Sequence, residues 1–231
     1  MLEESVDYLV DSGVQTPFIL LILIVLEAVL SADNAIALAA IAQNLSDPKL
    51  QRQALNIGLV GAYVLRITLI LTATWIVQFW QFELIGAFYL LWLVFDYFWF
   101  SNDKEAETTA DSSSPNYSSL WQIVPTIAMT DLAFSLDSVT TAIAVAEDTW
   151  LIIAGGTIGV ITLRFLAELF IRWLKEYVHL EDAGFITVGF VGLRLLLKVV
   201  MPELIIPEWI TIAVIFVLFT WGFSEREVKK S

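Results

Sequence analysis

The sequence of 231 residues contains no cysteine and only one histidine, His179. Without cysteine there is no disulfide and no thiolate metal site, and one histidine is too few for an imidazole-rich zinc or copper site. Any metal ion would therefore be held mainly by oxygen, which suits magnesium, calcium or manganese. Basic residues are also scarce, with 12 Lys and Arg against 25 Asp and Glu and a net charge of −13. Nucleic acid is not an expected partner, because phosphate binding requires a basic face.

Signatures of enzymatic chemistry are also missing from the sequence. No glycine-rich loop is followed by Lys-Ser or Lys-Thr, so a nucleotide-hydrolysing site is not expected. No nucleophile with a nearby base is evident, and His179 falls in a predicted loop. We therefore expect no enzyme activity, no catalytic residues and no organic cofactor.

Apolar residues are abundant instead, at 58% of the chain, while charged residues make up 16% and the mean hydropathy is +0.77. Soluble domains are about half apolar and about a quarter charged, so this composition predicts an all-α polytopic membrane protein. A membrane-spanning helix needs about 20 mostly apolar residues. Seven segments meet that criterion: Pro17–Ala42, Ala54–Phe79, Phe82–Phe100, Leu120–Val145, Trp150–Leu174, Gly184–Val200 and Ile205–Phe223.

The position of basic residues predicts how these segments are oriented, because cytoplasmic loops carry the excess of Lys and Arg. With the amino terminus outside, only Lys198 falls on the extracytoplasmic side. Eight basic residues then fall on the cytoplasmic side: Lys49, Arg52, Lys104, Arg172, Lys175, Arg226, Lys229 and Lys230. We therefore predict an extracytoplasmic amino terminus and a cytoplasmic carboxyl terminus.

Two segments share a pattern of acidic and small polar residues. Residues 27–34 are Glu-Ala-Val-Leu-Ser-Ala-Asp-Asn, and residues 131–138 are Asp-Leu-Ala-Phe-Ser-Leu-Asp-Ser. In the helix after each motif, a Gly-x-x-Gly pair is followed five residues later by an arginine, Arg66 or Arg164. Each repeat would hold three helices, and because three is odd the two repeats would be inverted, a common transporter architecture. We predict one membrane domain (1–231) with repeat 1 (17–100), a cytoplasmic linker (101–119), repeat 2 (120–200) and a seventh helix (205–223).

The motif acids are expected to lie deep within their helices, where an ionised side chain costs about 2.5–3.5 kcal/mol unless it has a partner. Positions i, i+4 and i+7 share one face of a helix, so the first, fifth and eighth residues of each motif form a stripe. Asp33 and Asp137 fall about 120° from that stripe on an ideal helix. Two alternatives stay open for them. Either they face a neighbouring helix, with Arg66 or Arg164 as partner, or the helices are broken there.

If the two stripes face each other, they form an oxygen-rich site suited to a divalent cation. Arg66 and Arg164 would offset part of its negative charge. The competing interpretation is that acids and arginines form buried structural ion pairs without a ligand. The predicted metal ligands are Glu27, Ser31, Asp33, Asn34, Asp131, Ser135, Asp137 and Ser138.

The two motifs resemble the signature motifs of the TerC family of membrane proteins, and the likeness extends from about residue 18 to 223. The resemblance implies a place in the LysE-like transporter superfamily and a role in Mn²⁺ efflux or homeostasis. We expect a secondary transporter that exports Mn²⁺, with Ca²⁺ or another divalent ion as a further cargo. An alternative is a membrane protein biogenesis or metallation factor acting with the export or insertion machinery. The expected location is a plasma or thylakoid membrane, and the expected partners are the lipid bilayer, a divalent cation, that machinery and a second copy of the chain.

Overall fold

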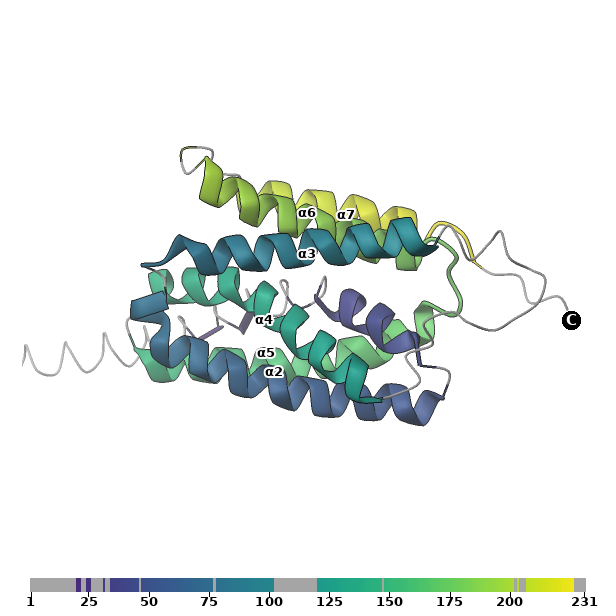
Figure 1. The fold of residues 1–231 in the computed structure, drawn as a ribbon, viewed down its shortest axis with the longest axis horizontal. Coiled ribbons are helices and arrows are strands. Elements are labelled where there is room, and N and C mark those ends of the chain that lie inside the picture. Colours follow the sequence, from purple (N-terminus) through teal and green to yellow (C-terminus); the bar gives the residue numbers. More distant parts are fainter. Residues whose placement is uncertain are drawn as a thin grey trace, which may run out of the picture.

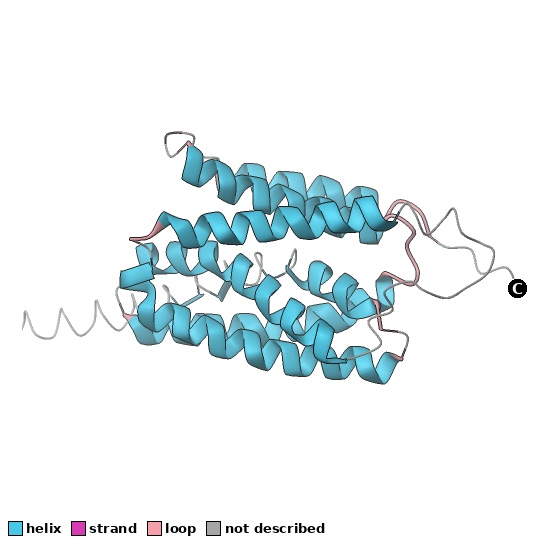
Figure 2. Ribbon diagram, viewed as in Figure 1, coloured by secondary structure: helices cyan, strands magenta, loops and turns pink. Residues whose placement is uncertain are grey.

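The regular elements of the computed structural model are α-helices (Figures 1 and 2). It describes residues 20–21, 24–25, 31, 34–45, 47–76, 78–101, 120–146, 148–201, 203 and 207–226. Within this part, β pairing is limited to an isolated bridge between Tyr177 and Arg226, so the all-α prediction is confirmed here. The helices are α2 (Pro48–Ile76), α3 (Trp80–Ser101), α4 (Leu120–Val145), α5 (Thr149–Trp173), α6 (Leu180–Val200), α7 (Glu208–Gly222) and the Asn34–Gln43 helix.

Four stretches of the described chain are long and apolar enough to cross a membrane: Pro48–Ala73, Trp80–Trp99, Thr149–Trp173 and Leu180–Val200. Helix α4, at 26 residues, is also long enough to cross a membrane, but two aspartates and several hydroxyl side chains lower its hydropathy. Helix α7 and the Asn34–Gln43 helix are apolar but shorter. The fold is therefore consistent with a membrane protein, while seven spans and the inverted repeat stay predictions.

The observed helix ends lie within a few residues of the predicted apolar segments: α2 ends at Ile76 rather than Phe79, and α7 covers Glu208–Gly222 rather than Ile205–Phe223. The largest difference is at the start of α2. Helix α4 has the predicted bounds, whereas α2 begins at Pro48, six residues before the predicted Ala54. The reason is local: Asp47 Oδ1 accepts a hydrogen bond from the Lys49 backbone N–H at 2.8 Å, as an N-cap residue does. Proline is well suited to the first helical position that follows. Helix α2 therefore starts in a polar segment that a search for apolar runs passes over.

The helices form two groups around a buried centre (Figure 1). Helix α2 packs against α4 and α5, while α3 packs against α6, which in turn packs against α7; α3 also contacts α4. The Asn34–Gln43 helix is rich in alanine and almost wholly buried, from Ala35 to Ala42. Figure 1 shows α2 and α5 running in opposite directions, as do α3 and α6.

Helices α2 and α4 approach each other closely at Gly58. A Cβ atom added there would lie 2.5 Å from Cγ2 and 2.8 Å from Cβ of Ile127, which is itself fully buried. Only glycine allows this approach without moving the isoleucine. Arg66 lies about two turns further along α2. The close contact therefore holds Arg66 within reach of the motif on α4.

Candidate functional site

A buried ion pair joins α2 to the motif on α4. Arg66 Nη2 donates to both carboxylate oxygens of Asp131 at 3.4 Å, and its Nε donates to Ser135 Oγ at 2.9 Å. Ser135 Oγ in turn donates to the Asp131 backbone carbonyl at 2.7 Å. The side chains of Arg66 and Asp131 are 1% and 0% exposed. Each charge therefore depends on the other, since water does not reach either one.

The second motif lies on an unbroken helix. Helix α4 continues from Leu120 to Val145, so the helix is not broken at residues 131–138. Asp131, Ser135 and Ser138 are all buried, as their shared stripe predicts. Beside them, Thr130 is fully buried and shares a 3.1 Å hydrogen bond with Tyr89 of α3. The stripe therefore faces the interior of the bundle.

Two of the four predicted ligands in the first motif fall in the described part of the chain. Ser31 is fully buried and Asn34 nearly so. Ser31 Oγ is one of three buried side-chain polar atoms in that part without a hydrogen-bond partner, the others being Gln51 Oε1 and Thr211 Oγ1. Glu27 and Asp33 lie outside the described residues, so their roles as ligands stay predictions.

Asp137 faces α6. Its Oδ2 lies 3.1 Å from Arg194 Nη1, and its Oδ1 lies 3.1 Å from Lys198 Nζ. Lys198 Nζ also donates to Glu83 Oε1 of α3 at 3.0 Å. Of the open alternatives, Asp137 therefore faces a neighbouring helix, but its basic partners are neither Arg66 nor Arg164. The formal charges of this four-residue cluster cancel.

Arg194, Lys198 and Glu83 are not among the predicted site residues, although the sequence contains a signal for two of them. Arg194 and Lys198 are four residues apart and therefore share one face of α6. Lys198 was also the one basic residue on the predicted extracytoplasmic side. A lone basic pair on one helical face inside a membrane requires an acidic partner. Nothing in the spacing, however, identifies that partner as Asp137.

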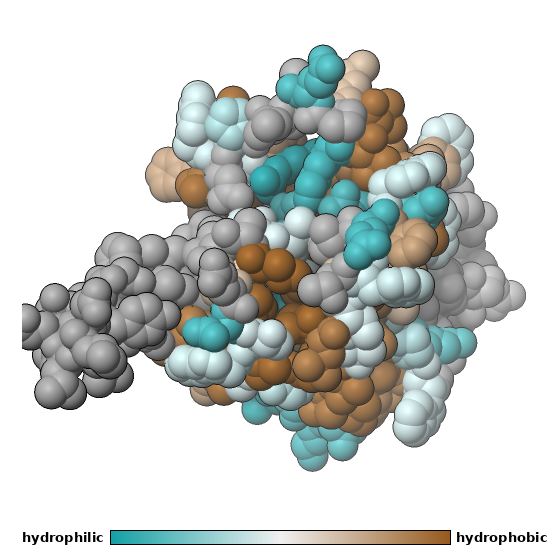
Figure 3. Space-filling view, turned by 90° about the vertical axis from the view of Figure 1, so that its left-hand side faces the viewer, coloured by the Kyte–Doolittle hydropathy of each residue, from teal (hydrophilic) through white to brown (hydrophobic). Residues whose placement is uncertain are grey.

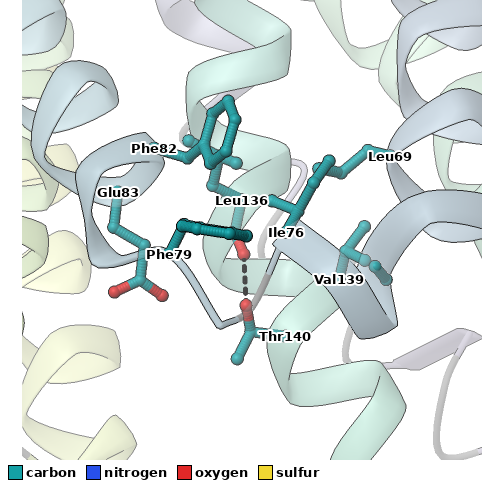
Figure 4. A pocket seen from close by; sticks show the side chains of 9 residues that line it. Leu69, Ile76, Phe79, Phe82, Glu83, Leu136, Val139 and Thr140 are labelled. Carbon is teal, nitrogen blue, oxygen red and sulfur yellow. Dashed lines mark hydrogen bonds between the residues drawn. The ribbon is translucent and has the colours of Figure 1, made fainter.

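A small cavity lies between α2, α3 and α4 near this cluster. Its volume is about 10 Å³, and it is lined mainly by apolar side chains, including Phe79, Phe82 and Leu136, with Glu83 and Thr140 (Figure 4). The Thr140 hydroxyl donates to the Leu136 carbonyl at 2.7 Å. A space of this size holds about one water molecule. It is too small and too apolar to hold a hydrated cation.

Seen from the end of the bundle where α3 begins and α6 ends, hydrophilic side chains gather in the upper half of the face (Figure 3). In Figure 1 that half is formed by α3, α6 and α7, and the apolar side chains of Figure 3 lie largely below it. Other hydrophilic side chains lie along the lower edge of this face, so its polar surface is not confined to one helix group (Figure 3).

Arg164 occupies a different environment from Arg66. It donates from Nε to Asn56 Oδ1 of α2 and from Nη1 to Glu168 Oε2 at 3.0 Å. Its side chain is 25% exposed. The role predicted for Arg164, balancing the charge of the motif acids, stays a prediction, and its hydrogen bonds are made with Asn56 and Glu168.

The structure thus brings together Arg66, Asp131 and Ser135, and separates Asp137 onto the α6 side. Within the part of the chain that it describes, no group of three or more His, Asp or Glu side chains is placed to hold a metal ion. That part excludes two of the four motif carboxylates. The predicted cage of four carboxylates is therefore neither assembled nor excluded by these contacts.

The sequence matches a known family over almost its full length. Residues 13–229 match the profile described as the integral membrane protein TerC family. The chain belongs to the TerC family. The resemblance seen in the two motifs is thereby confirmed, and the TerC protein is an integral membrane protein with several apolar helices.

Three relatives illustrate the range of the TerC family. The uncharacterized membrane proteins YceF and YkoY of Bacillus subtilis are 36% and 35% identical, over 75% and 78% of this chain and 68% and 60% of theirs. The chloroplastic thylakoid membrane protein TERC of Arabidopsis thaliana is 25% identical over 75% of this chain and 52% of its own. The chain thus spans about half to two thirds of the length of these relatives. No solved structure matches it.

Proposed function

We propose that this TerC protein exports a divalent metal cation, with Mn²⁺ as the leading cargo and Ca²⁺ as the second. The site would be built by both motifs near the middle of the membrane. The observation that carries the proposal is the buried polar stripe of α4, with Asp131 and Ser135 fully buried and Ser138 nearly so. A lipid-embedded protein retains such costly groups where they serve a ligand or an ion pathway. Oxygen donors of this kind match a hard or borderline divalent cation.

The formal charges of the two motifs also suit a divalent cargo. Asp131 lies against Arg66, and the cluster of Glu83, Asp137, Arg194 and Lys198 is formally neutral. The first motif adds the carboxylates of Glu27 and Asp33, and a divalent cation held between the motifs would be matched by two such negative charges.

A buried hydroxyl without a hydrogen-bond partner supports a cation site at the motifs. Ser31 Oγ is buried in the first motif without a hydrogen-bond partner, and a buried hydroxyl left unpaired costs about 1–3 kcal/mol. Coordination of a cation by Ser31 Oγ would remove that cost. The opposite directions of α2 and α5, and of α3 and α6, are what an inverted repeat requires for alternating access (Figure 1).

The proposal is tested by Mn²⁺ flux into proteoliposomes containing the purified full chain and a quenched internal dye. We expect flux for the wild type, and flux at the level of empty liposomes for Asp131→Asn and for Asp33→Asn combined with Asp137→Asn. Asp148→Asn is the matched control, because Asp148 lies before α5 and its side chain makes no capping hydrogen bond. The control should transport Mn²⁺ at the wild-type rate.

The alternative, a biogenesis or metallation factor working with the export or insertion machinery, predicts a different result. Folded wild-type protein would then move no Mn²⁺ or Ca²⁺ across a proton gradient of either sign. That outcome would overturn the transporter proposal. Flux that survives in all the motif variants would instead place the cation path outside the two motifs.

A further inference from the structure

A groove runs along the outer surface of the bundle between α2 and α5. Its volume is about 440 Å³, and most of its wall is apolar, with Leu59, Val60, Val160, Ile161 and Phe165 among the lining residues. Val60 and Phe165 are 65% and 71% exposed, so the groove opens outward, where a TerC protein meets the bilayer. The two ends of the groove differ in chemistry, and that difference indicates what the groove can hold.

At one end of the groove, beside Tyr63 and Thr157, a polar contact joins the two helices. The Tyr63 hydroxyl of α2 and the Thr157 hydroxyl of α5 share a hydrogen bond of 3.0 Å. Each hydroxyl is thereby satisfied, so this end offers no free charge to a ligand. From Thr157 to Arg164 the groove follows seven residues of α5, about 10 Å of helix. That length covers about a third of a hydrocarbon core of ~30 Å.

The opposite end of the groove is positively charged. Arg164 lines it, and Glu168 next to it is surrounded by three guanidinium groups. Arg164 Nη1, Arg52 Nη2 and Arg172 Nη2 lie 3.0, 3.2 and 3.5 Å from the Glu168 carboxylate. Three positive charges against one negative leave a formal charge of +2, and each planar guanidinium has more N–H donors than these contacts use. This end therefore attracts an anion, although the chain as a whole carries −13.

We propose that the α2–α5 groove binds one anionic phospholipid. Its acyl chain lies over Val60, Ile161 and Phe165, and its phosphate lies against Arg164 and Arg52. Basic pockets between membrane helices suit acidic lipid headgroups, and arginine pairs with phosphate through parallel N–H donors. The cluster lies where α2 begins and α5 ends, so headgroup and chain are held at the correct relative depth. Lipid bound here fastens α2, which carries Arg66, to α5.

The lipid site does not depend on metal transport, and it is tested by binding alone. The purified full chain is titrated with phosphatidylglycerol and with phosphatidylcholine, and bound lipid is counted by native mass spectrometry. The wild type should prefer phosphatidylglycerol. Each basic residue near an anionic headgroup is worth about 1 kcal/mol, so Arg164→Gln should weaken phosphatidylglycerol binding roughly fivefold. Phosphatidylcholine binding should fall less, because the choline cation cancels the charge of its phosphate.

Three further variants separate this site from general surface charge. Lys175→Gln removes the same charge just beyond α5, outside the cluster, and should bind as the wild type does. Arg52→Gln, at a side chain 59% exposed, repeats the charge test should Arg164→Gln fail to fold. Val60→Trp fills the groove and should weaken the binding of both lipids.

Several outcomes would overturn the lipid proposal. Equal binding of the two lipids by the wild type would exclude a headgroup site. An equal loss in Lys175→Gln would assign the preference to the general surface potential. Competition by millimolar inorganic phosphate without any effect of Val60→Trp would indicate an anion site that needs no acyl chain. A change only in the monomer–dimer ratio of Val60→Trp would make the groove a contact between copies.

Discussion

Arg66 and Arg164 are equivalent in the sequence and different in the structure. Each follows a Gly-x-x-Gly pair by five residues in the helix after a motif. Arg66 is 1% exposed and holds Asp131 and Ser135 across the helix interface, whereas Arg164 is 25% exposed and binds Asn56 and Glu168 beside a surface groove. Two arginines in matching positions of the predicted repeat therefore have different burial and different partners.

The residue one turn further along each helix explains the difference. Four residues after Arg164 stands Glu168, an acid on the same helix face, and the two form an ion pair at 3.0 Å. Four residues after Arg66 stands Ile70, which offers no charge. Arg66 must therefore find its acid on another helix, and the acid it finds is the motif residue Asp131. Local charge pairing thus separates an arginine held by an acid of its own helix from one held by the motif on α4.

The largest expected effect on stability is that of replacing Arg66, the buried partner of Asp131. Arg66→Gln leaves Asp131 charged and unpaired in the interior and should destabilise the protein by about 3–5 kcal/mol. Arg164→Gln leaves Glu168 with Arg52 and Arg172 and should cost no more than about 1 kcal/mol. The measurement is the thermal unfolding midpoint of the two purified variants in one detergent. Equal midpoints would mean that the two arginines are energetically equivalent after all.

A double variant controls for the loss of packing in Arg66→Gln. Replacing the whole pair with apolar side chains, as Arg66→Met with Asp131→Leu, removes both charges together. Substitutions of this kind are often neutral or stabilising, so most of the lost stability should return. Mn²⁺ flux should not return, because Asp131 is a proposed ligand. Stability that stays low in the double variant would assign the effect to packing rather than charge.

The next effect compares the glycines that precede the two arginines. A Cβ at Gly58 would lie 2.5 Å from Ile127 Cγ2, so Gly58→Ala should cost about 1–3 kcal/mol through overpacking. A Cβ at Gly156 would meet nothing closer than Arg66 Cδ at 3.6 Å, an ordinary contact. Gly156→Ala should therefore be neutral or stabilise the helix by about 0.5–1 kcal/mol. Chemical denaturation of both variants measures the difference, and an equal loss would contradict the closer α2–α4 approach.

These differences also show how far sequence can lead. Apolar runs predicted α4 with its bounds, because its ends coincide with the change from apolar to polar residues. They missed the first turns of α2, where Asp47 and Pro48 start a polar helical segment. The motif stripe on α4 was predicted from helical periodicity alone, and Asp131, Ser135 and Ser138 are indeed buried together.

The partners of the charged residues were harder to predict, because they depend on how distant helices meet. Asp137 was expected to face a neighbouring helix, with Arg66 or Arg164 as partner, or to lie at a break. It does face a neighbouring helix, α6, but its partners are Arg194 and Lys198. Helical spacing shows that α6 carries two basic residues on one face, but not which helix that face contacts. The ion pair of Arg164 with Glu168 could be predicted from their i, i+4 spacing alone. Arg66 has no acid at that spacing, and this difference in the sequence could have distinguished the two arginines.

The smallest expected effect is at the acid that holds Arg164. Glu168→Gln removes ion pairs that are partly exposed, and exposed or i, i+4 pairs contribute about 0.3–1 kcal/mol in all. Salt screens such pairs, since the Debye length falls from about 10 Å at 0.1 M to about 3 Å at 1 M. The wild-type protein should therefore lose this small stability on going from low to high salt, whereas Glu168→Gln, which already lacks the ion pairs, should change less.

Asp131→Asn is the contrasting variant. Its loss of stability relative to the wild type should be larger and should not depend on salt, because the bundle shields Asp131 and Arg66 from the solvent. A salt-dependent loss in Asp131→Asn would mean that water and ions reach the buried pair, and that the centre is open rather than closed.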